Sequence, residues 1–300
     1  LLVAASRKSW KPFLMGALVV CNIAIYWWIL SPRGTEVLRV TFLDVGQGAA
    51  VFVEFPGGAT MLIDGGPKTF SFDAGERTVV PFLRHREVEK IDYLVLSHPH
   101  GDHLGGLPAV MRAIQIGTVV EGGSAGRSAL YKEFGMLADS LRLPRISSFA
   151  GNMIGEGLPA RVYVLSPERE QGEGTDNLNE RSLVLRIRYG RTSVLFPGDA
   201  EDGAETRMVA RYGAFLDSDI LKAGHHGSRT SSTEEFLSNA SPAYAVISAG
   251  EGNTFGHPSG IVLERLSRLG SRIDRTDESG AAVFESDGTA WRRIDRHEWQ

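Results

Sequence analysis

The pattern of apolar and polar residues divides the chain into two parts. Residues 13–30 (FLMGALVVCNIAIYWWIL) carry no charge, and a run of this length can cross the hydrocarbon layer of a membrane as one helix. Tyr26, Trp27 and Trp28 stand near its end, where an interfacial aromatic belt lies, and basic residues precede it. The pattern predicts a membrane segment over 1–34, containing one transmembrane helix. A cleaved signal peptide and a buried core helix are the alternatives.

The positive charges before the run also predict an orientation. Under the positive-inside rule the N-terminus lies in the cytoplasm, and the residues after 31 lie outside the cytoplasmic (inner) membrane. The chain begins with Leu1 rather than Met, so we expect it to be a fragment or a processed product.

From residue 37 onward, short apolar runs alternate with segments rich in Gly, Pro and Asp, which is typical of strands joined by turns. Strands are expected at 37–43, 50–55, 60–63, 91–97, 116–120, 161–165, 183–188, 193–196, 219–223 and 243–248, with a closing hairpin over 281–293. Helices are expected at 78–86, 104–113, 129–141, 201–212, 233–239 and 259–269. Two groups of strands, each followed by helices, predict an α/β fold of two packed sheets with helices outside. No polar linker separates the groups, so 35–300 is predicted to be one domain.

The composition excludes several classes of protein. Hydrophobic residues make up 42% and charged residues 23%, which is typical of a folded globular chain rather than a disordered or collagen-like one. A single Cys excludes a disulfide framework and a thiolate-rich zinc site. The formal net charge is −4, which argues against a general nucleic-acid-binding surface. Any contact with a phosphate backbone must therefore come from a local patch or a metal.

The most specific chemical signal is the segment 97–103 (SHPHGDH), directly after an expected buried strand. Imidazole and carboxylate groups are ligands suited to zinc, manganese or iron, and a rigid strand holds the loop in place. Asp64, Asp199 and the pair His225-His226 follow other expected strands. Because binding residues concentrate on loops held by a scaffold, we expect all of them to gather in one metal site.

Together these motifs resemble those of the metallo-β-lactamase superfamily, and more closely those of the C-terminal domain of the ComEC family of competence proteins. The resemblance is carried by 42–48 (FLDVGQG), 62–66 (LIDGG), 97–106 (SHPHGDHLGG), 182–185 (SLVL), 196–201 (FPGDAE), 221–228 (LKAGHHGS), 252–258 (GNTFGHP) and 275–281 (RTDESGA). It implies a metallo-β-lactamase-type αββα sandwich with metals at the edge of the sheets. It also implies that a polytopic channel region precedes this domain in a longer chain.

The resemblance further implies two divalent metal ions, zinc or manganese first and magnesium as a third candidate. By motif, the ligands are His98 and His100 for one ion, Asp102 and His103 for the other, and Asp199 as the bridge between them. One of the tandem histidines completes the second site, and His225 is favoured because it is nearer the strand end. Asp64 supports the site rather than binding a metal.

Other residues are candidates for catalysis or support. Asp102, His226, Asn253 and His257 are the catalytic candidates. Asn253 and His257 are expected to donate hydrogen bonds to the developing charge or to protonate the leaving oxygen, although His257 could instead cap the following helix. Ser228 is expected to bind phosphate through its hydroxyl and the N-terminus of the next helix.

One motif of the superfamily is missing. No histidine lies between His103 and His225, so the third-motif histidine is absent, and Asn179 or Ser182 occupies its vicinity. The first metal site should therefore be weaker or completed by water. Oxygen-rich sites suit harder ions, which keeps manganese and magnesium beside zinc as candidates.

These features predict a membrane-tethered, metal-dependent phosphodiesterase or nuclease. The resemblance implies that it acts on DNA, in single-stranded form, during uptake in natural transformation. A metal pair suits this reaction because it activates water and neutralises a phosphoryl oxygen. One alternative is an exported phosphodiesterase or phosphocholine esterase acting on small or surface-attached esters. Another is a DNA-guiding module without hydrolysis, which the missing histidine favours. Arginines within 181–191 and 292–296 suit DNA, but basic runs are more often solvated faces.

Overall fold

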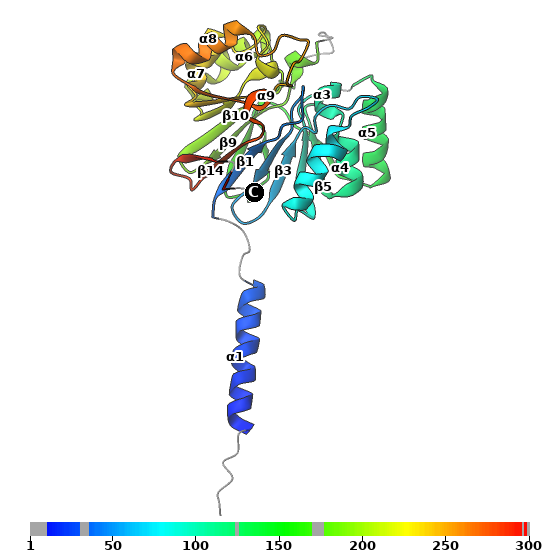
Figure 1. Ribbon diagram of the computed structural model, residues 1–300, viewed down its shortest axis with the longest axis vertical. Helices are drawn as coiled ribbons and strands as arrows, with labels where there is room; N and C mark the ends of the chain where they lie inside the picture. The colour runs from blue at the N-terminus through cyan, green and yellow to red at the C-terminus, as the bar shows by residue number, and fades with distance from the viewer. Residues whose placement is uncertain (1–10, 31–35, 124–125, 170–176, 296, 299–300) are drawn as a thin grey trace, which may run out of the picture. The chain divides into compact units, whose positions relative to one another are not determined.

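The computed structural model describes residues 11–30, 36–123, 126–169, 177–295 and 297–298 of the chain (Figure 1). The chain divides into two compact units, Leu1–Gly34 and Thr35–Gln300. The first contains helix α1 (Lys11–Leu30), of 20 residues, with exposed apolar side chains such as Phe13 and Val20. Within the described residues, no helix combines the length and the apolar character required of a membrane span.

The second unit contains two β-sheets. The first sheet has eight strands in the order β15-β14-β1-β2-β3-β4-β5-β6, and the second has seven in the order β13-β12-β11-β10-β9-β8-β7. The first comprises β1 (Leu38–Phe42), β2 (Val51–Glu54), β3 (Thr60–Ile63), β4 (Lys90–Leu96), β5 (Gln115–Glu121), β6 (Arg145–Ser147), β14 (Ala282–Ser286) and β15 (Trp291–Ile294). The second comprises β7 (Met153–Ile154), β8 (Arg161–Ser166), β9 (Val184–Tyr189), β10 (Thr192–Phe196), β11 (Ile220–Lys222), β12 (Tyr244–Ile247) and β13 (Arg272–Arg275).

Helices cover the outer face of each sheet. In Figure 1, α4 and α5 lie on one side of the sandwich, and α6, α7 and α8 lie on the other. On the first side are η1 (Gly75–Val79), α2 (Val80–His85), α3 (Gly101–Leu104), α4 (Leu107–Ala113) and α5 (Ala129–Ser140). On the second are α6 (Asp202–Tyr212), η3 (Gly213–Leu216), α7 (Glu234–Ala240) and α8 (Gly260–Leu269). The short helices η2 (Asn179–Arg181), η4 (Gly224–Gly227) and α9 (Thr276–Ser279) lie in connections.

Three buried apolar clusters hold these layers together. The central cluster lies between the sheets, where the Phe42 ring contacts those of Phe196 and Phe284 at centroid distances of 6.0 and 6.1 Å. A second cluster joins the first sheet to its helices, and a third joins the second sheet to α6, α7 and α8. Burial of one face of each sheet against the other and of the opposite face under helices is the αββα arrangement. The predicted sandwich is therefore confirmed.

The expected strands and helices are present, with differences at a few boundaries. The helix expected at 104–113 is divided into α3 and α4 at Gly105 and Gly106. A Cβ atom on Gly106 would lie 2.1 Å from the carbonyl oxygen of Gly65, so only glycine permits this approach. Strands β6, β7 and β13 were not predicted. They are short, and β6 and β13 are rich in charged or exposed residues, so they lack the apolar pattern that marks a strand.

Glu205 of α6 is a buried carboxylate that holds the start of α7. Its Oε1 and Oε2 accept the backbone N–H groups of Ser232 and Thr233 at 2.6 and 2.8 Å. Burial raises the pKa of Glu205 to about 7, although these N–H groups oppose the rise. The carboxyl group is thus more readily protonated in the folded chain than in the unfolded chain.

This shift predicts a pH dependence of stability. Between the ordinary glutamate pKa of 4.5 and the folded value of about 7, the folded chain binds more protons than the unfolded chain. The contribution of Glu205 to the free energy of unfolding should therefore be full below that window and be lost as the pH rises through it. Glu205→Gln should flatten this dependence, measured by urea denaturation at several pH values. An unchanged slope in the variant would contradict the assignment.

Candidate metal centre

The candidate ligands stand where strands end at one edge of the sandwich. Strand β4 ends at Leu96, and the loop after it carries His98 and His100 before α3 begins. Asp102 and His103 lie within α3, which Gly101 opens. Because β3 and β4 are parallel, and β10 and β11 are parallel, the loops that follow these strands meet at the same edge of each sheet. Segments far apart in the sequence therefore reach one place.

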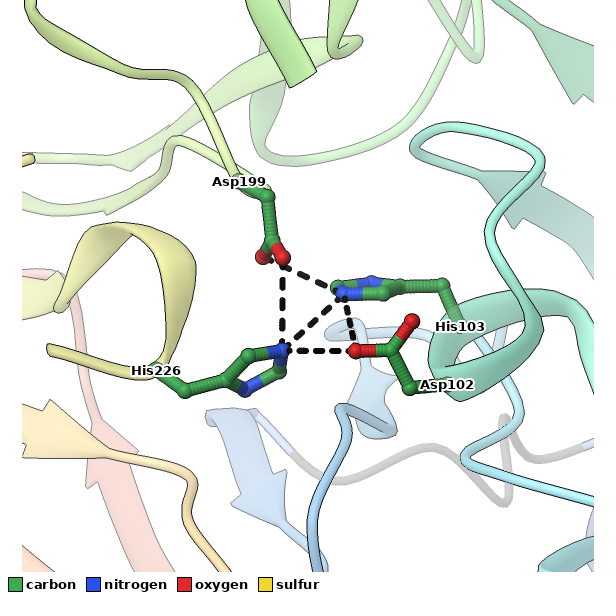
Figure 2. Close-up of side chains that lie close together, drawn as sticks. All are labelled: Asp102, His103, Asp199 and His226. Carbon is green, nitrogen blue, oxygen red and sulfur yellow. Dashed lines mark hydrogen bonds and ion pairs between the residues drawn. The ribbon is translucent and has the colours of Figure 1, made fainter. Parts of the chain in front are cut away.

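Four side chains converge there, from α3 and from the loops after β10 and β11. Figure 2 shows Asp102, His103, Asp199 and His226 pointing toward one another. Their ligand atoms all lie within 4.8 Å of one another. His103 Nε2 lies 3.1 Å from Asp199 Oδ1, and His226 Nε2 lies 3.3 Å from Asp199 Oδ2. His226 Nε2 is also 3.2 Å from both His103 Nε2 and Asp102 Oδ2.

The proton positions on the two imidazoles show that this cluster fits a cation. His103 Nδ1 lies 2.7 Å from Asp64 Oδ2, and His226 Nδ1 lies 2.8 Å from the carbonyl oxygen of Ser248. Both partners are acceptors, so in the neutral form of each ring the proton belongs on Nδ1 and Nε2 presents a lone pair. Two lone pairs and two carboxylates that face each other repel unless a positive charge lies between them. Ligand atoms around a tetrahedral ion with bonds of about 2.1 Å are about 3.4 Å apart, which fits these separations.

The electrostatics of the cluster agree with this requirement. Burial disfavours the charged form of His103, but Asp199, Asp64 and Asp102 outweigh it and raise the pKa of His103 well above its ordinary value. The pKa of His226 is raised too, because Asp199 and Asp102 overcome the effect of burial. Burial alone would raise the pKa of Asp199, yet His103 and His226 hold it well below the ordinary value. The site therefore favours positive charge at its centre, which a divalent cation supplies.

His98 and His100, the predicted ligands of the first ion, lie beside this group, but His98 is further from Asp199 than the two histidines of the group are. His98 Nε2 is 3.0 Å from His100 Nδ1 and 4.0 Å from Asp199 Oδ2. Burial and the neighbouring His103 lower the pKa of His98 well below its ordinary value, so its ring stays neutral and can act as a ligand. In the described part of the chain, one group of three or more ligands is compact enough for an ion, and it contains neither His98 nor His100.

The tandem histidines separate into two environments. His226 is buried and joins the group of four, whereas His225 Nε2 lies 3.9 Å from Asp199 Oδ2. His225 Nδ1 instead lies 3.2 Å from Glu201 Oε1. The structure thus brings His226, rather than the favoured His225, to the place of the ligand. The cause is local, since both residues have left-handed backbone angles, φ 46° and 55°, that turn the two rings apart.

Asp64 and Ser182 support the cluster. Asp64 accepts hydrogen bonds from Ser97 N at 2.8 Å and Ser97 Oγ at 2.7 Å, in addition to that from His103. Ser182 Oγ accepts the backbone N–H of Asp199 at 3.2 Å and so holds the loop after β10. Asp64 orients the His103 ring and Ser182 holds the backbone of Asp199, as the partners of metal ligands commonly do.

Asn179 and Ser228 lie near the cluster without entering it. Asn179 Nδ2 donates to Glu201 Oε1 at 3.3 Å, and its buried Oδ1 has no hydrogen-bond partner among the described residues. Ser228 Oγ lies 3.0 Å from Thr230 Oγ1. The next helix, α7, is capped by Thr233, five positions further on, so Ser228 does not stand at its N-terminus as expected.

His257 and Asn253 occupy one loop but have different roles. The amide oxygen of Asn253 accepts the N–H groups of Phe255 and His257, and its Nδ2 donates to the carbonyl oxygens of Gly250 and His257. Its polar atoms therefore hold the loop instead of facing the reacting groups. Ser259, not His257, stands at the N-cap of α8, so His257 does not cap that helix. Its ring centroid is 6.4 Å from that of His226.

The cluster opens into a cavity of about 570 Å³. The cavity is lined by Val45, Gly46, Gln47, Pro67, Lys68, Thr69, Phe72, Gly101, Asp102, His225, His226, Phe255 and His257. Among site residues that sequence reasoning missed, buried Lys222 lies 3.9 Å from Asp199 Oδ1, and Glu201 contacts His225. Glu201 lies in the motif at 196–201 and Lys222 in the motif at 221–228. Their positions inside these motifs were the signal by which the sequence could have identified them.

Residues 43–251 match the family described as the metallo-beta-lactamase superfamily, and the chain belongs to it. It is 28% identical over 303 residues to ComE operon protein 3 of Bacillus subtilis strain 168, which covers 95% of this chain and 37% of that protein. It is 34% identical over 246 residues to competence protein ComA of Neisseria gonorrhoeae, covering 82% and 32% respectively. The chain therefore spans about a third of the length of these relatives.

Among solved structures, the metallo-beta-lactamase fold protein YhfI from Bacillus subtilis superimposes with a TM-score of 0.55 at 14% identity, over 83% of this chain and 100% of that one. This likeness concerns the fold. The relatives confirm the resemblance to the ComEC family. Proteins of this superfamily are typically metal-dependent hydrolases that bind divalent ions, usually two, and the cluster offers such a site.

Proposed function

We propose that this chain is a metal-dependent phosphodiesterase that cleaves DNA, in single-stranded form, during uptake in natural transformation. The observation that carries the proposal is a compact group of four candidate metal ligands, two of which, Asp102 and His226, line an open cavity. The cavity is large enough for part of a polymeric substrate. A relative named competence protein ComA supports DNA uptake as the context.

The proposed roles of the cluster residues are those of metal ligands. His103, Asp199, His226 and Asp102 hold a divalent cation, zinc or manganese, with magnesium as a third candidate. Such an ion supplies Lewis acidity and lowers the pKa of water. His98 and His100, with Asp199, are the proposed ligands of a second ion. Because Asp199 reaches toward both groups, its carboxylate is the proposed bridge.

His257 is suited to donate a hydrogen bond to the leaving oxygen as negative charge develops there. Gln47 Oε1 accepts the N–H of Gly250 at 3.1 Å, so the Gln47 amide NH₂ faces His257 Nδ1 at 3.3 Å and donates to it. The proton of the neutral ring therefore resides on Nε2, on a side chain that lines the cavity. Burial, followed by the neighbouring His225 and His226, lowers the pKa of His257, which keeps the ring neutral at physiological pH.

The proposal includes the location of the protein in the cell. Helix α1 contains the uncharged run 13–30, and we propose that this run anchors the chain in the cytoplasmic membrane, with the residues after 31 on the outer side. The DNA would then pass from this site to an upstream channel region of the same longer protein. A phosphocholine or other small phosphodiester is the second candidate substrate, because the cavity is open and partly apolar.

The proposal is tested with the whole 300-residue chain in detergent. A labelled single-stranded oligonucleotide, the matching duplex and a phosphocholine diester are incubated with Mn²⁺, Zn²⁺ or Mg²⁺, and with EDTA. We expect cleavage of the single strand with at least one metal and none with EDTA. His100→Ala should lower the rate, since it removes a proposed ligand. Absence of cleavage with all three metals, or turnover of the choline ester alone, would contradict a DNA substrate.

A further inference from the structure

Three rings lead in series from the metal cluster to the surface. The rings of His226 and His257 are nearly parallel, with an interplanar angle of 22° and centroids 6.4 Å apart. The rings of His257 and Phe255 follow at 28° and 6.0 Å. Phe255 ends the series and is 68% exposed, so one more flat ring has room to stack on it.

From this arrangement we propose that Phe255 is a stacking platform for one unpaired nucleobase, next to the phosphate held at the metal centre. The inference rests on the proposed function and adds the residue that would select the single-stranded form of the substrate. A base stacks on any aromatic face without regard to its sequence, and such contacts are the usual way in which proteins hold single strands. Phe255 would therefore determine substrate form rather than sequence.

The loop that carries Phe255 is held rigidly. Asn253 Oδ1 accepts the N–H groups of Phe255 at 3.2 Å and His257 at 3.1 Å. Asn253 Nδ2 donates to the carbonyl oxygens of His257 and Gly250 at 2.6 and 2.9 Å. The backbone that carries this large, exposed apolar side chain is thus held in place. A preorganised loop loses little conformational freedom when a ligand stacks on its side chain.

The cavity beside Phe255 has the chemistry that a nucleotide requires. Phe72 and Pro67 belong to its lining together with Phe255, and Asp102 and His226 of the metal cluster line the same cavity. Lys68, also in the lining, adds a positive charge, although it is paired with Asp73 at 3.1 Å. An apolar wall beside a cation site suits a ligand that is flat and apolar at one end and anionic at the other. A nucleotide has this form.

A base in duplex DNA cannot reach this platform without leaving its stack. Unpairing and unstacking cost a few kcal/mol in a duplex and much less in a single strand. The platform should therefore favour unpaired strands, and the preference should depend on the base itself. This dependence separates the inference from a general attraction of the phosphate backbone.

The test measures binding and cleavage with the 300-residue chain. A fluorescent oligothymidylate and the same strand with abasic residues at its centre are titrated in EDTA, which prevents cleavage, and are then cleaved with Mn²⁺. For Phe255→Ala we expect the Kd for the oligothymidylate to rise about 5- to 100-fold, with no change for the abasic strand. Phe255→Trp should bind as the wild type does.

Phe70→Ala is the matched control, because Phe70 is fully exposed at 109% but is not part of the cavity lining. It should leave both affinities unchanged. Equal losses on the two strands, or no loss on either, would overturn the platform. So would competition by choline at the same site, which would make Phe255 part of a cation-recognising surface. If the wild-type chain cleaves the oligothymidylate and the abasic strand equally well, the platform alone is refuted. If the chain cleaves no DNA but still binds the oligothymidylate more tightly than the abasic strand, only the nuclease function is refuted.

Discussion

Replacing His226 by alanine is expected to remove the metal ion from the group of four and to lower the rate of hydrolysis by more than about 100-fold. His226 Nε2 lies 3.2–3.3 Å from Asp102, His103 and Asp199, which is the position of a ligand. Changes to residues that merely orient a ligand cost about 10- to 100-fold in metal affinity or activity, so loss of the ligand itself should cost more. Metal content after desalting, by mass spectrometry, and the hydrolysis rate measure both effects.

His225→Ala is the matched control, since it removes the same side chain one residue away. His225 Nδ1 is paired with Glu201, and its Nε2 stands further from Asp199, at 3.9 Å. We expect this variant to retain the ion of the four-residue group, with a change in metal affinity of less than about 10-fold. If His225→Ala lost that ion and His226→Ala kept it, the placement of the two rings would be wrong.

The sequence does not predict which of His225 and His226 is the metal ligand. The motif at 221–228 indicates that a histidine after β11 faces the metal site, but both candidates lie within four residues of the strand end at Lys222. The choice depends on the left-handed backbone of His225 and His226 and on the carbonyl oxygen of Ser248, which accepts a hydrogen bond from His226 Nδ1. Contacts of this kind exist only after the chain has folded, and no local pattern encodes them.

The layers of the fold could be predicted from the sequence more fully than the choice between the two histidines. A strand such as β4 carries a nearly continuous apolar run because most of both its faces is covered, and such runs are visible in the sequence. Strand β13 contains Arg272 and Arg275 and lies at the edge of its sheet, where no apolar run is required. Its place was set by pairing with β12 rather than by its own composition. Buried Lys222 was missed for a similar reason, because lysine in a strand usually marks a solvated face.

Asp64→Asn is expected to weaken metal binding by about 10- to 100-fold while the chain stays folded. The buried Asp64 carboxylate accepts three hydrogen bonds, from Ser97 N, Ser97 Oγ and His103 Nδ1. An asparagine has one acceptor oxygen, and its NH₂ group would face at least one of these donors. The His103 ring would then lose the partner that keeps its proton on Nδ1 and its lone pair on Nε2, directed at the cluster.

Titration with Zn²⁺ and with Mn²⁺, together with circular dichroism of the same samples, separates a loss of orientation from a loss of structure. Ser97→Ala is the control, because it removes only the 2.7 Å hydroxyl bond to Asp64 and leaves the bond from His103 in place. Its metal affinity should fall by less than that of Asp64→Asn. Equal losses in the two variants would mean that the hydrogen bonds of the Ser97 loop, and not the tautomer of His103, determine the affinity. The orienting role of Asp64 would then be refuted, since that role depends on the hydrogen bond that the carboxylate accepts from His103 Nδ1.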